Sequence, residues 1–146
     1  LAKACEVALK LSEEALVVGA DTIVVLDGEV LGKPKDPAEA EAMLSRLSGR
    51  THTVITGVAV VRAPGMDERV ESAETEVTFR PLSPEEIRSY VRSGEPMDKA
   101  GAYGIQGRAG LMVASLCGCY YNVMGLPVAT LAEMLKEFGV KAFNGK

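Results

Sequence analysis

Apolar residues recur at helical spacing in four segments of the chain. In the first segment, Ala4, Val7 and Leu11 fall on one side of a helix with 3.6 residues per turn. Two other segments begin with capping residues, because Asp36 and Ser83 each precede a proline and can accept hydrogen bonds from the free N–H groups of a first turn. The predicted helices span residues 1–11, 36–49, 83–94 and 127–138.

A long apolar run near the N-terminus predicts a strand and a hairpin. Residues 16–26 are apolar apart from Asp21 and Thr22, and the Asp-Gly pair at 27–28 is a hairpin turn signal, so 29–31 is the expected returning strand. A carboxylate inside an apolar strand costs stability unless it is paired, hydrated or bound to a cation. We therefore expect Asp21 to be paired with a positive charge, hydrated or bound to a cation.

Two further stretches, 51–62 and 69–79, are rich in β-forming residues, and polar and apolar positions alternate in the second, which predicts one wetted face. Residues 94–125 hold seven of the 15 glycines and few helix signals, so the backbone there can turn tightly or approach a ligand. Because strands and helices interleave, the fold class is predicted to be α/β, with a mixed β-sheet and flanking helices.

Length and composition indicate one soluble domain. The chain has 146 residues and a mass of 15.4 kDa, with 47% apolar and 25% charged residues. No apolar run approaches the roughly 18 residues that span a bilayer, so we expect a cytoplasmic protein with no membrane partner. The net charge is −4 and the basic residues are scattered, which argues against nucleic acid as a partner.

The cysteine and histidine content limits the metal chemistry. Three cysteines, Cys5, Cys117 and Cys119, fit neither a zinc knuckle nor a redox pair and are expected to be reduced. His52 is the only histidine, which excludes a histidine-rich zinc or iron site, and it is expected to be structural. A bound metal would therefore be a hard ion such as Mg²⁺, held by carboxylates and phosphates.

The first candidate site combines Asp21 and Thr22 with Lys33, twelve residues after the acid. A carboxylate at the end of a buried strand and an ammonium on the hairpin's return can form an anion-and-metal site. A lysine so placed can grip phosphate oxygens. The alternative is a structural ion pair at the edge of the sheet.

The second candidate site is the segment 98–107, Asp-Lys-Ala-Gly-Ala-Tyr-Gly-Ile-Gln-Gly. It carries the side chains of Asp98, Lys99, Tyr103 and Gln106 on a glycine-rich backbone, which suits a phosphate chain and the edge of a base. Gln106 can donate and accept hydrogen bonds at once, as recognition of a pyrimidine through O4 and N3 requires. The alternative is a solvated loop with Tyr103 packed in the core.

Six motifs, in order along nearly the whole chain, resemble the Maf family of nucleoside triphosphate pyrophosphatases. They are Gly-Ala-Asp-Thr at 19–22, Gly-Lys-Pro at 32–34, Leu-Ser-Gly-Arg-Thr-His at 47–52, Thr-Gly-Val at 56–58, the segment 98–107, and Asn-Val-Met-Gly-Leu-Pro at 122–127. The Ala-Tyr-Gly-Ile-Gln-Gly form is similar to the branch acting on dTTP and UTP. The resemblance implies an α/β body with a deep cleft, a divalent metal (Mg²⁺ or Mn²⁺) and a homodimer.

The resemblance also implies roles for individual residues. Asp21 would be the central catalytic carboxylate, either binding the metal or activating water, and Lys33 would act beside it on the phosphates. Metal and lysines together would offset the charge that builds on phosphate oxygens during attack by water. The residues expected to bind substrate are Lys3, Thr22, Asp98, Lys99 and Gln106.

The chain departs from the family pattern at its start. Family members begin with a strand and a Ser-x-Arg-Arg phosphate-binding loop upstream of the helix that carries Lys3. Residues 1–146 are therefore expected to form a single Maf-like domain without that strand and loop. The alternative function is a non-catalytic nucleotide-binding module or a regulator of cell division.

Overall fold

A computed structural model describes residues 1–141 and 143 of the chain. In that part, five strands form a sheet in the order β2-β1-β3-β4-β5. The strands are β1 (Ala15–Leu26), β2 (Glu29–Leu31), β3 (Thr51–Ala63), β4 (Glu68–Phe79) and β5 (Val113–Cys117). The helices are α1 (Ala2–Leu9), α2 (Pro37–Leu47), α3 (Pro84–Arg92), α4 (Tyr120–Met124) and α5 (Val128–Glu137). Three 3-10 helices join α3 to β5: η1 (Glu95–Asp98), η2 (Ala100–Ala102) and η3 (Arg108–Met112).

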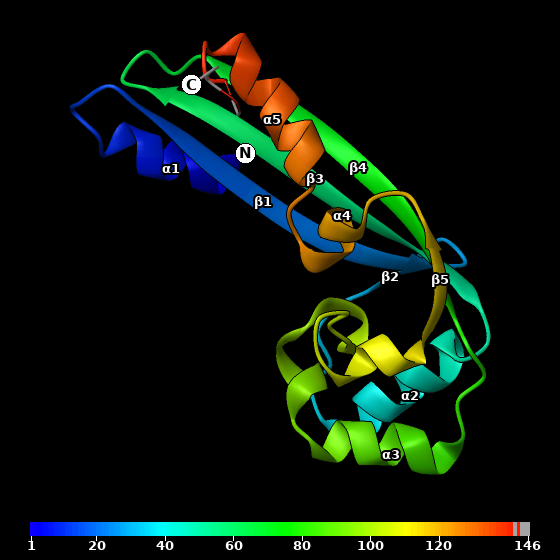
Figure 1. The fold of residues 1–146 in the computed structure, drawn as a ribbon. Coiled ribbons are helices and arrows are strands. Elements are labelled where there is room, and N and C mark those ends of the chain that lie inside the picture. The colour runs from blue at the N-terminus through cyan, green and yellow to red at the C-terminus, as the bar shows by residue number, and fades with distance from the viewer. Residues whose placement is uncertain (142, 144–146) are drawn as a thin grey trace.

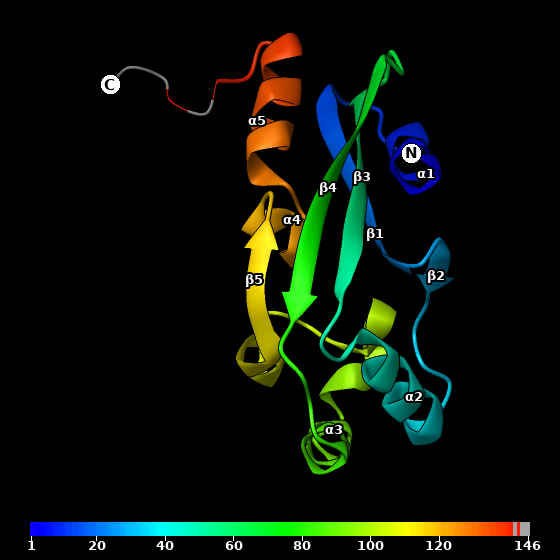
Figure 2. The ribbon, with the colours of Figure 1, turned by 90° about the vertical axis from the view of Figure 1, so that its right-hand side faces the viewer.

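Helices cover both faces of the long strands. Figure 2 shows α1 against one face, with α4 and α5 on the other. Ala4 of α1 is buried in a small apolar cluster with Ala59 of β3. On the opposite face, Met134 of α5 packs with Val58 and Val60. Alternate residues of β3 therefore serve two separate apolar layers.

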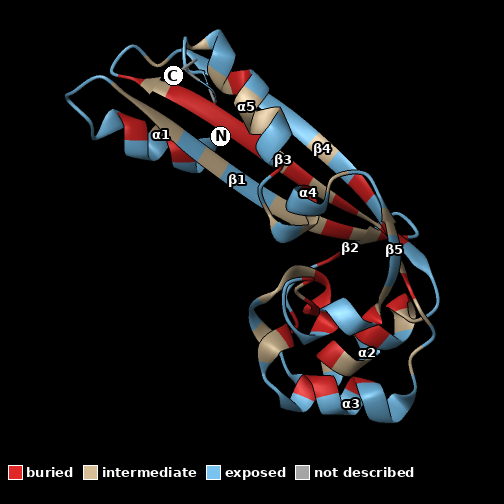
Figure 3. Ribbon diagram, viewed as in Figure 1, coloured by how far each residue is buried: buried red, intermediate tan, exposed pale blue. Residues whose placement is uncertain are grey.

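The remaining helices form a lobe at one end of the sheet, below the strands in Figure 1. The largest apolar cluster joins the lobe to the strands, since it includes Leu44 of α2 and Ile87 of α3 together with Val24, Val54 and Phe79 of the sheet. Figure 3 shows the buried faces of α2 and α3 turned toward each other within this lobe. The lobe is thus fixed to the sheet by continuous apolar packing.

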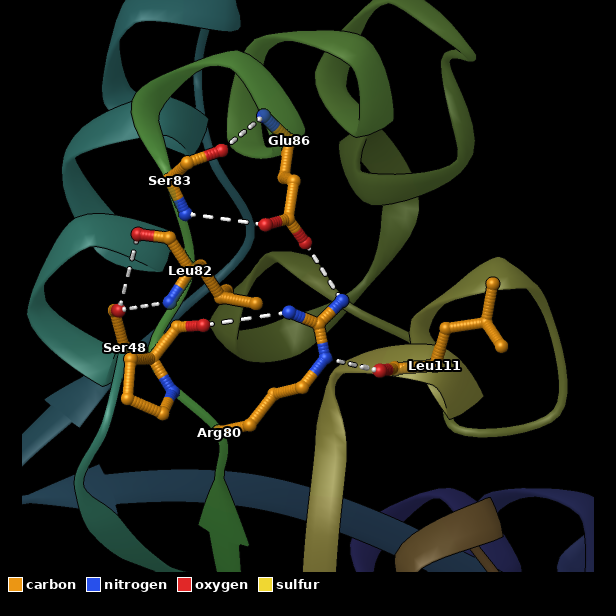
Figure 4. Close-up of polar contacts among 7 residues, drawn as sticks. Ser48, Arg80, Leu82, Ser83, Glu86 and Leu111 are labelled. Carbon is orange, nitrogen blue, oxygen red and sulfur yellow. Dashed lines mark hydrogen bonds and ion pairs between the residues drawn. The ribbon is translucent and has the colours of Figure 1, made fainter.

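Polar contacts fix the start of α3 beside the segment that leads into β5 (Figure 4). Ser83 and Glu86 form a reciprocal capping box, as their sequence predicts. Arg80 donates hydrogen bonds to Glu86 Oε2 at 2.6 Å and to the Leu111 carbonyl at 2.7 Å. One guanidinium therefore links the end of β4, the first turn of α3 and η3.

The four predicted helices and the first hairpin are confirmed, and the caps lie where the sequence places them. Asp36 Oδ1 accepts a hydrogen bond from the Glu39 N–H at 2.8 Å. The wetted face predicted for β4 is present in its second half, where Thr75, Val77 and Phe79 are buried. Val70 is exposed, because alternation places it on the same face as Ser72, Glu74 and Glu76, which are exposed as well.

The α/β class is confirmed, but the sheet is antiparallel at every described pairing instead of mixed. Parallel pairing needs a crossover that carries the chain back along the face of a sheet. Here α2 and α3 lie beyond the end of the strands, so β3 and β5 start from the end at which β1 and β4 finish (Figure 1). Each new long strand therefore runs opposite to its neighbour.

The glycine-rich region holds more regular structure than its sequence indicates. β5 and the short α4 were not predicted, because neither segment is long enough to show a clear period. No helix among the described residues has the length and apolar character needed to cross a membrane.

His52 is buried at the junction of sheet and lobe, as its expected structural role requires. Its ring makes edge contacts with the rings of Phe79 and Tyr103, and Nε2 lies 2.6 Å from the Tyr103 hydroxyl. Nδ1 has no hydrogen-bond partner among the described residues. Burial lowers the pKa of His52 from 6.5 to about 4, so the ring is neutral at pH 7.

Stability should therefore fall in acid through His52. Its pKa is depressed in the folded state, so the unfolded chain binds the proton first as the pH falls below 6.5, and the penalty grows until about pH 4. Over this pH range the lowered pKa of His52 reduces the free energy of unfolding by about 3 kcal/mol. We expect urea unfolding at pH 7 and pH 4.5 to show a smaller acid-induced loss for His52→Gln than for the unsubstituted protein. Equal losses of stability in the two proteins would contradict a lowered pKa of His52 in the folded state.

Candidate functional site

A cavity of about 570 Å³ lies where the sheet meets the lobe. β1, β3, α4 and the segment from η1 to the start of η3 contribute to its wall. Its lining residues are Asp21, Thr22, Val24, Lys33, Val54, Glu95, Lys99, Ala100, Tyr103, Gly104, Ile105, Gln106, Gly107, Val123, Met124 and Gly125. The volume falls in the range of pockets that enclose a small organic ligand.

Asp21 and Thr22 reach the cavity from an edge of the sheet. β2 pairs with β1 only from Val24 to Leu26, so in the described structure the two polar residues have β3 as their neighbour on one side alone. The Asp21 side chain is exposed, and Thr22 is half-buried. A carboxylate that water can reach carries no large burial cost there and is available to a ligand.

Two lysines approach the cavity from different segments. Lys33 follows β2, and the carbonyl of the preceding Gly32 accepts a hydrogen bond from the Gly101 N–H at 3.1 Å. The stem of Lys99 passes over Gly104, where a Cβ atom would lie 2.5 Å from Lys99 Cε. Glycine at 104 therefore gives the ammonium its route along the cavity wall.

Both ammonium groups act on the same carboxylate, that of Asp98. Lys99 Nζ lies 2.9 Å from Asp98 Oδ1, and this hydrogen bond is the main reason why the pKa of Asp98 is lowered; Lys33 adds a smaller attraction. An exposed ion pair of this kind is weak in water. A more highly charged anion can therefore compete with Asp98 for Lys99.

A chain of hydroxyl groups runs from the cavity into the sheet. Thr56 donates to the Asn122 carbonyl at 3.1 Å, and its Oγ1 lies 2.8 Å from Thr22 Oγ1. Since a hydroxyl has only one proton to donate, Thr22 must donate to Thr56. The lone pairs of Thr22 remain for the cavity, so Thr22 can accept a hydrogen bond from a ligand but not donate one.

Asn122 fixes α4 to β3 and β4 next to these hydroxyl groups. Its Nδ2 lies 2.8 Å from Thr75 Oγ1, 3.1 Å from the Ala73 carbonyl and 3.2 Å from the Val54 carbonyl. The residue is fully buried, and these acceptors come from both β3 and β4. The short helix has no side-chain cap of its own, so this contact fixes the wall formed by the residues that follow Asn122.

The structure brings together most of the residues singled out in the sequence. Six of them line the cavity: Asp21, Thr22, Lys33, Lys99, Tyr103 and Gln106. Lys3 lies exposed on α1 and Asp98 lies exposed beside Lys99, and neither is part of the lining. Substrate binding by any of these side chains stays a prediction.

Glu95 lines the cavity but has no distinctive motif in the sequence. It lies between Gly94, which precedes η1, and Pro96, and glycine and proline on either side are typical of a turn. Its carboxylate accepts hydrogen bonds from the Tyr90 hydroxyl and the Arg108 N–H. The clearest signal was chemical: it is an acid close to the Asp-Lys pair at 98–99.

The carboxylates fit a cation that a ligand shares, not a cage built by the protein. Among the described residues, no group of three or more acidic, histidine or cysteine side chains is placed to hold a metal. Asp21 and Glu95 are the acidic residues of the lining, and both oxygens of Glu95 are already hydrogen-bonded. Mg²⁺ is commonly held by one or two carboxylates together with substrate phosphates, and Asp21 suits that arrangement.

Comparison with known proteins gives a consistent result. A family model described as "Maf-like protein" matches residues 1–138. The dTTP/UTP pyrophosphatase of Symbiobacterium thermophilum is 63% identical over 131 residues, which cover 90% of this chain and 66% of that protein. The enzyme of the same name from Moorella thermoacetica is 61% identical over 144 residues, covering 99% and 74%. The chain thus spans about two thirds to three quarters of the length of these relatives.

Replacing Asn122 by alanine should destabilise the fold and loosen the cavity wall. The change removes the buried amide that donates to β3 and β4 and opens a small void, for a combined cost of about 3 kcal/mol. Urea unfolding measures this loss, with Thr51→Ala as the control, since the Thr51–Thr78 hydroxyl pair is exposed. A loss equal to that of the control would show that Asn122 is not the anchor of α4.

Proposed function

This chain belongs to the Maf-like protein family, and from that membership we propose that it hydrolyses nucleoside triphosphates, preferably dTTP and UTP, to the nucleoside monophosphate and pyrophosphate. The observation that carries the proposal is the convergence of Asp21, Lys33, Lys99 and Gln106 on one cavity. The relatives named dTTP/UTP pyrophosphatase support the reaction and the bases.

Lys33 and Lys99 are proposed to bind the phosphate chain. Both line the same cavity, so both can face one bound anion. Charge develops on nonbridging and leaving oxygens when the triphosphate is attacked, and fixed ammonium groups stabilise that charge more than the ground state. Moving Lys99 from Asp98 to a phosphate costs little free energy, because the Lys99–Asp98 ion pair is exposed to water.

Asp21 is proposed to act on the attacking water. A bond forms between the water oxygen and the α-phosphorus, and the bond from that phosphorus to the oxygen bridging toward the β-phosphorus breaks. Pyrophosphate leaves with the electron pair of the broken bond. Asp21 either accepts the proton of the water or holds the divalent cation, Mg²⁺ or Mn²⁺, which when bound would offset phosphate charge and lower the pKa of water.

Gln106 and Thr22 are proposed to read the base or its sugar. The amide of Gln106 can donate to O4 and accept from N3–H of thymine or uracil. Thr22 offers only lone pairs, because its proton is used by Thr56, so it suits an N–H or a hydroxyl and not a phosphate oxygen. The polar contacts are thus divided between the two ends of the nucleotide.

We further propose that the protein acts in the cytoplasm as a homodimer, with nucleotide and not nucleic acid or membrane as its partner. The scattered basic residues and the net charge of −4 give a long phosphate backbone no continuous binding surface. Light scattering on the purified chain measures the oligomeric state directly.

Asp21→Asn should lower pyrophosphate release from dTTP and UTP by at least about a hundredfold, since it removes both the charge and the basic oxygen. The assay measures pyrophosphate and orthophosphate separately, with Mg²⁺ or Mn²⁺. Asp67→Asn, on the exposed turn between β3 and β4, is the matched control and should keep the full rate.

Three outcomes would contradict this reaction. Release of orthophosphate alone would exclude a pyrophosphatase, and full activity of Asp21→Asn would place the catalytic acid elsewhere. Tight binding of a nonhydrolysable dTTP analogue by calorimetry, without any turnover of dTTP, would favour a nucleotide-binding module.

Gln106→Leu should lower the kcat/KM for dTTP about tenfold, because the hydrogen bonds proposed to O4 and N3–H are both lost and these base atoms are left unpaired. The value for a nucleotide with a different base edge, such as dCTP, should change less. Steady-state kinetics with both nucleotides measure the ratio. An unchanged ratio would mean that Gln106 does not contact the base.

A further inference from the structure

The loop at 104–108 is attached at both ends to the same pair of side chains. The Gly104 N–H donates to the Tyr90 hydroxyl at 3.3 Å, and that hydroxyl donates to Glu95 Oε1 at 3.1 Å. The Arg108 N–H donates to Glu95 Oε2 at 3.3 Å. Tyr90 and Glu95 therefore form a clamp across the loop that carries Gln106.

The middle of the loop also lies against the clamp. A Cβ atom at Gly107 would collide with the Glu95 carboxylate, so the backbone reaches the acid only because residue 107 is glycine. The Gly107 N–H donates to the Gly104 carbonyl at 3.1 Å, which closes the loop on itself. The loop is thus held by its own turn and by an acid beneath it.

Tyr90 is suited to a permanent role in this clamp. Its side chain is 4% exposed and belongs to the large apolar cluster of the lobe. Burial is the main reason why the pKa of Tyr90 is raised, so the hydroxyl keeps its proton at any working pH. It therefore always has one proton for Glu95 and lone pairs for Gly104.

The bonding of Glu95 separates it from the residues that would act on phosphate. Both of its oxygens accept hydrogen bonds from the protein, although the side chain lies in the cavity wall. In a general base or a metal ligand, an oxygen must be directed at the water or the cation. The bonds of Glu95 are directed instead at the loop.

We propose that Glu95, with Tyr90, is a positioning residue that holds Gln106 in place and so sets the base selectivity of the cavity. The inference rests on the proposed pyrophosphatase function and deepens it. Asp21 and Lys33 lie on other segments, so loss of the clamp affects recognition of the base more than the hydrolytic step.

The test compares three substitutions in the full chain: Glu95→Ala, Glu95→Gln and Tyr90→Phe. Alanine removes both acceptors. Glutamine loses the charge but keeps a carbonyl for the Arg108 N–H and an amide that can donate to the Tyr90 hydroxyl, so it retains much of the clamp. Phenylalanine keeps the packing of Tyr90 and removes only the link to Gly104 and Glu95. Glu13→Ala, in the exposed turn before β1, is the control.

We expect Glu95→Ala to raise the KM for dTTP about tenfold, to lower the dTTP-to-dCTP ratio of kcat/KM by a similar factor, and to leave kcat within about threefold. Glu95→Gln should stay within about threefold of the unsubstituted protein in all three quantities, and Tyr90→Phe should fall between them. A loss of kcat in Glu95→Gln as large as in Asp21→Asn would overturn the proposal, because it would make the charge of Glu95 catalytic. Unchanged selectivity in Glu95→Ala would also overturn it.

Amide hydrogen exchange gives a readout that does not depend on turnover. The clamp predicts faster exchange at Gly104 and Arg108 in Glu95→Ala than in the control, with unchanged protection in β3 and β4. Protection lost throughout the chain, or unchanged at the loop, would contradict the clamp. Faster loop exchange in a chain without pyrophosphatase activity would leave the clamp in place while refuting the proposed function.

Discussion

The constraint that shapes this molecule is that the two long connections between its strands lie at the same end of the sheet, while a short turn joins β3 to β4 at the other end (Figure 1). β1 leads through β2 and α2 into β3, and β4 leads through α3 and the 3-10 helices into β5, so both long connections are confined to the lobe. Neither crosses a sheet face, which leaves the faces to α1, α4 and α5 (Figure 2). Polar residues at the ends of these connections are consequently brought to one junction. The sheet and the lobe are in contact through a common apolar core. Beside that core their surfaces are separated, and the cavity lies between them.

Hydrogen bonds behind the cavity decide what each lining side chain can offer a ligand. Thr22 donates its hydroxyl proton to Thr56, and Thr56 donates its own to the Asn122 carbonyl. The Thr22 oxygen therefore faces the cavity as an acceptor. Glu95 is occupied by Tyr90 and the loop backbone. Asp21, which lines the cavity and is exposed, is the carboxylate that water or a cation reaches most freely. The chemical division of the cavity thus follows from contacts beneath its surface as much as from the residues that line it.

Local signals in the sequence predict the elements well and their pairing less well. Asp36 and Ser83 mark two helix starts because capping is a property of three or four adjacent residues. The direction of β3 depends on where α2 lies relative to the sheet, which periodicity does not contain, and this is why a mixed sheet was expected. Motif spacing located Asp21, Lys33 and Gln106, whereas Glu95 was missed because its partners are a tyrosine side chain and a backbone N–H. Contacts of that kind leave no pattern in the chain.

To select one pyrimidine over another, a site must present a donor or an acceptor at a fixed position. An amide side chain that is free to rotate does not do this. The side chain of Gln106 is exposed, and rotation by half a turn exchanges its donor and its acceptor. By itself such an amide can pair with the edge of uracil in one orientation and with that of cytosine in the other. Discrimination must come from neighbours whose polarity cannot reverse, and Thr22 is one, since its proton is committed to Thr56. A ligand group facing Thr22 has to donate, as an N–H or a hydroxyl does, so an unprotonated ring nitrogen such as N3 of cytosine cannot take that place. A loop held in one position beside such an acceptor can convert an ambiguous amide into a selective contact.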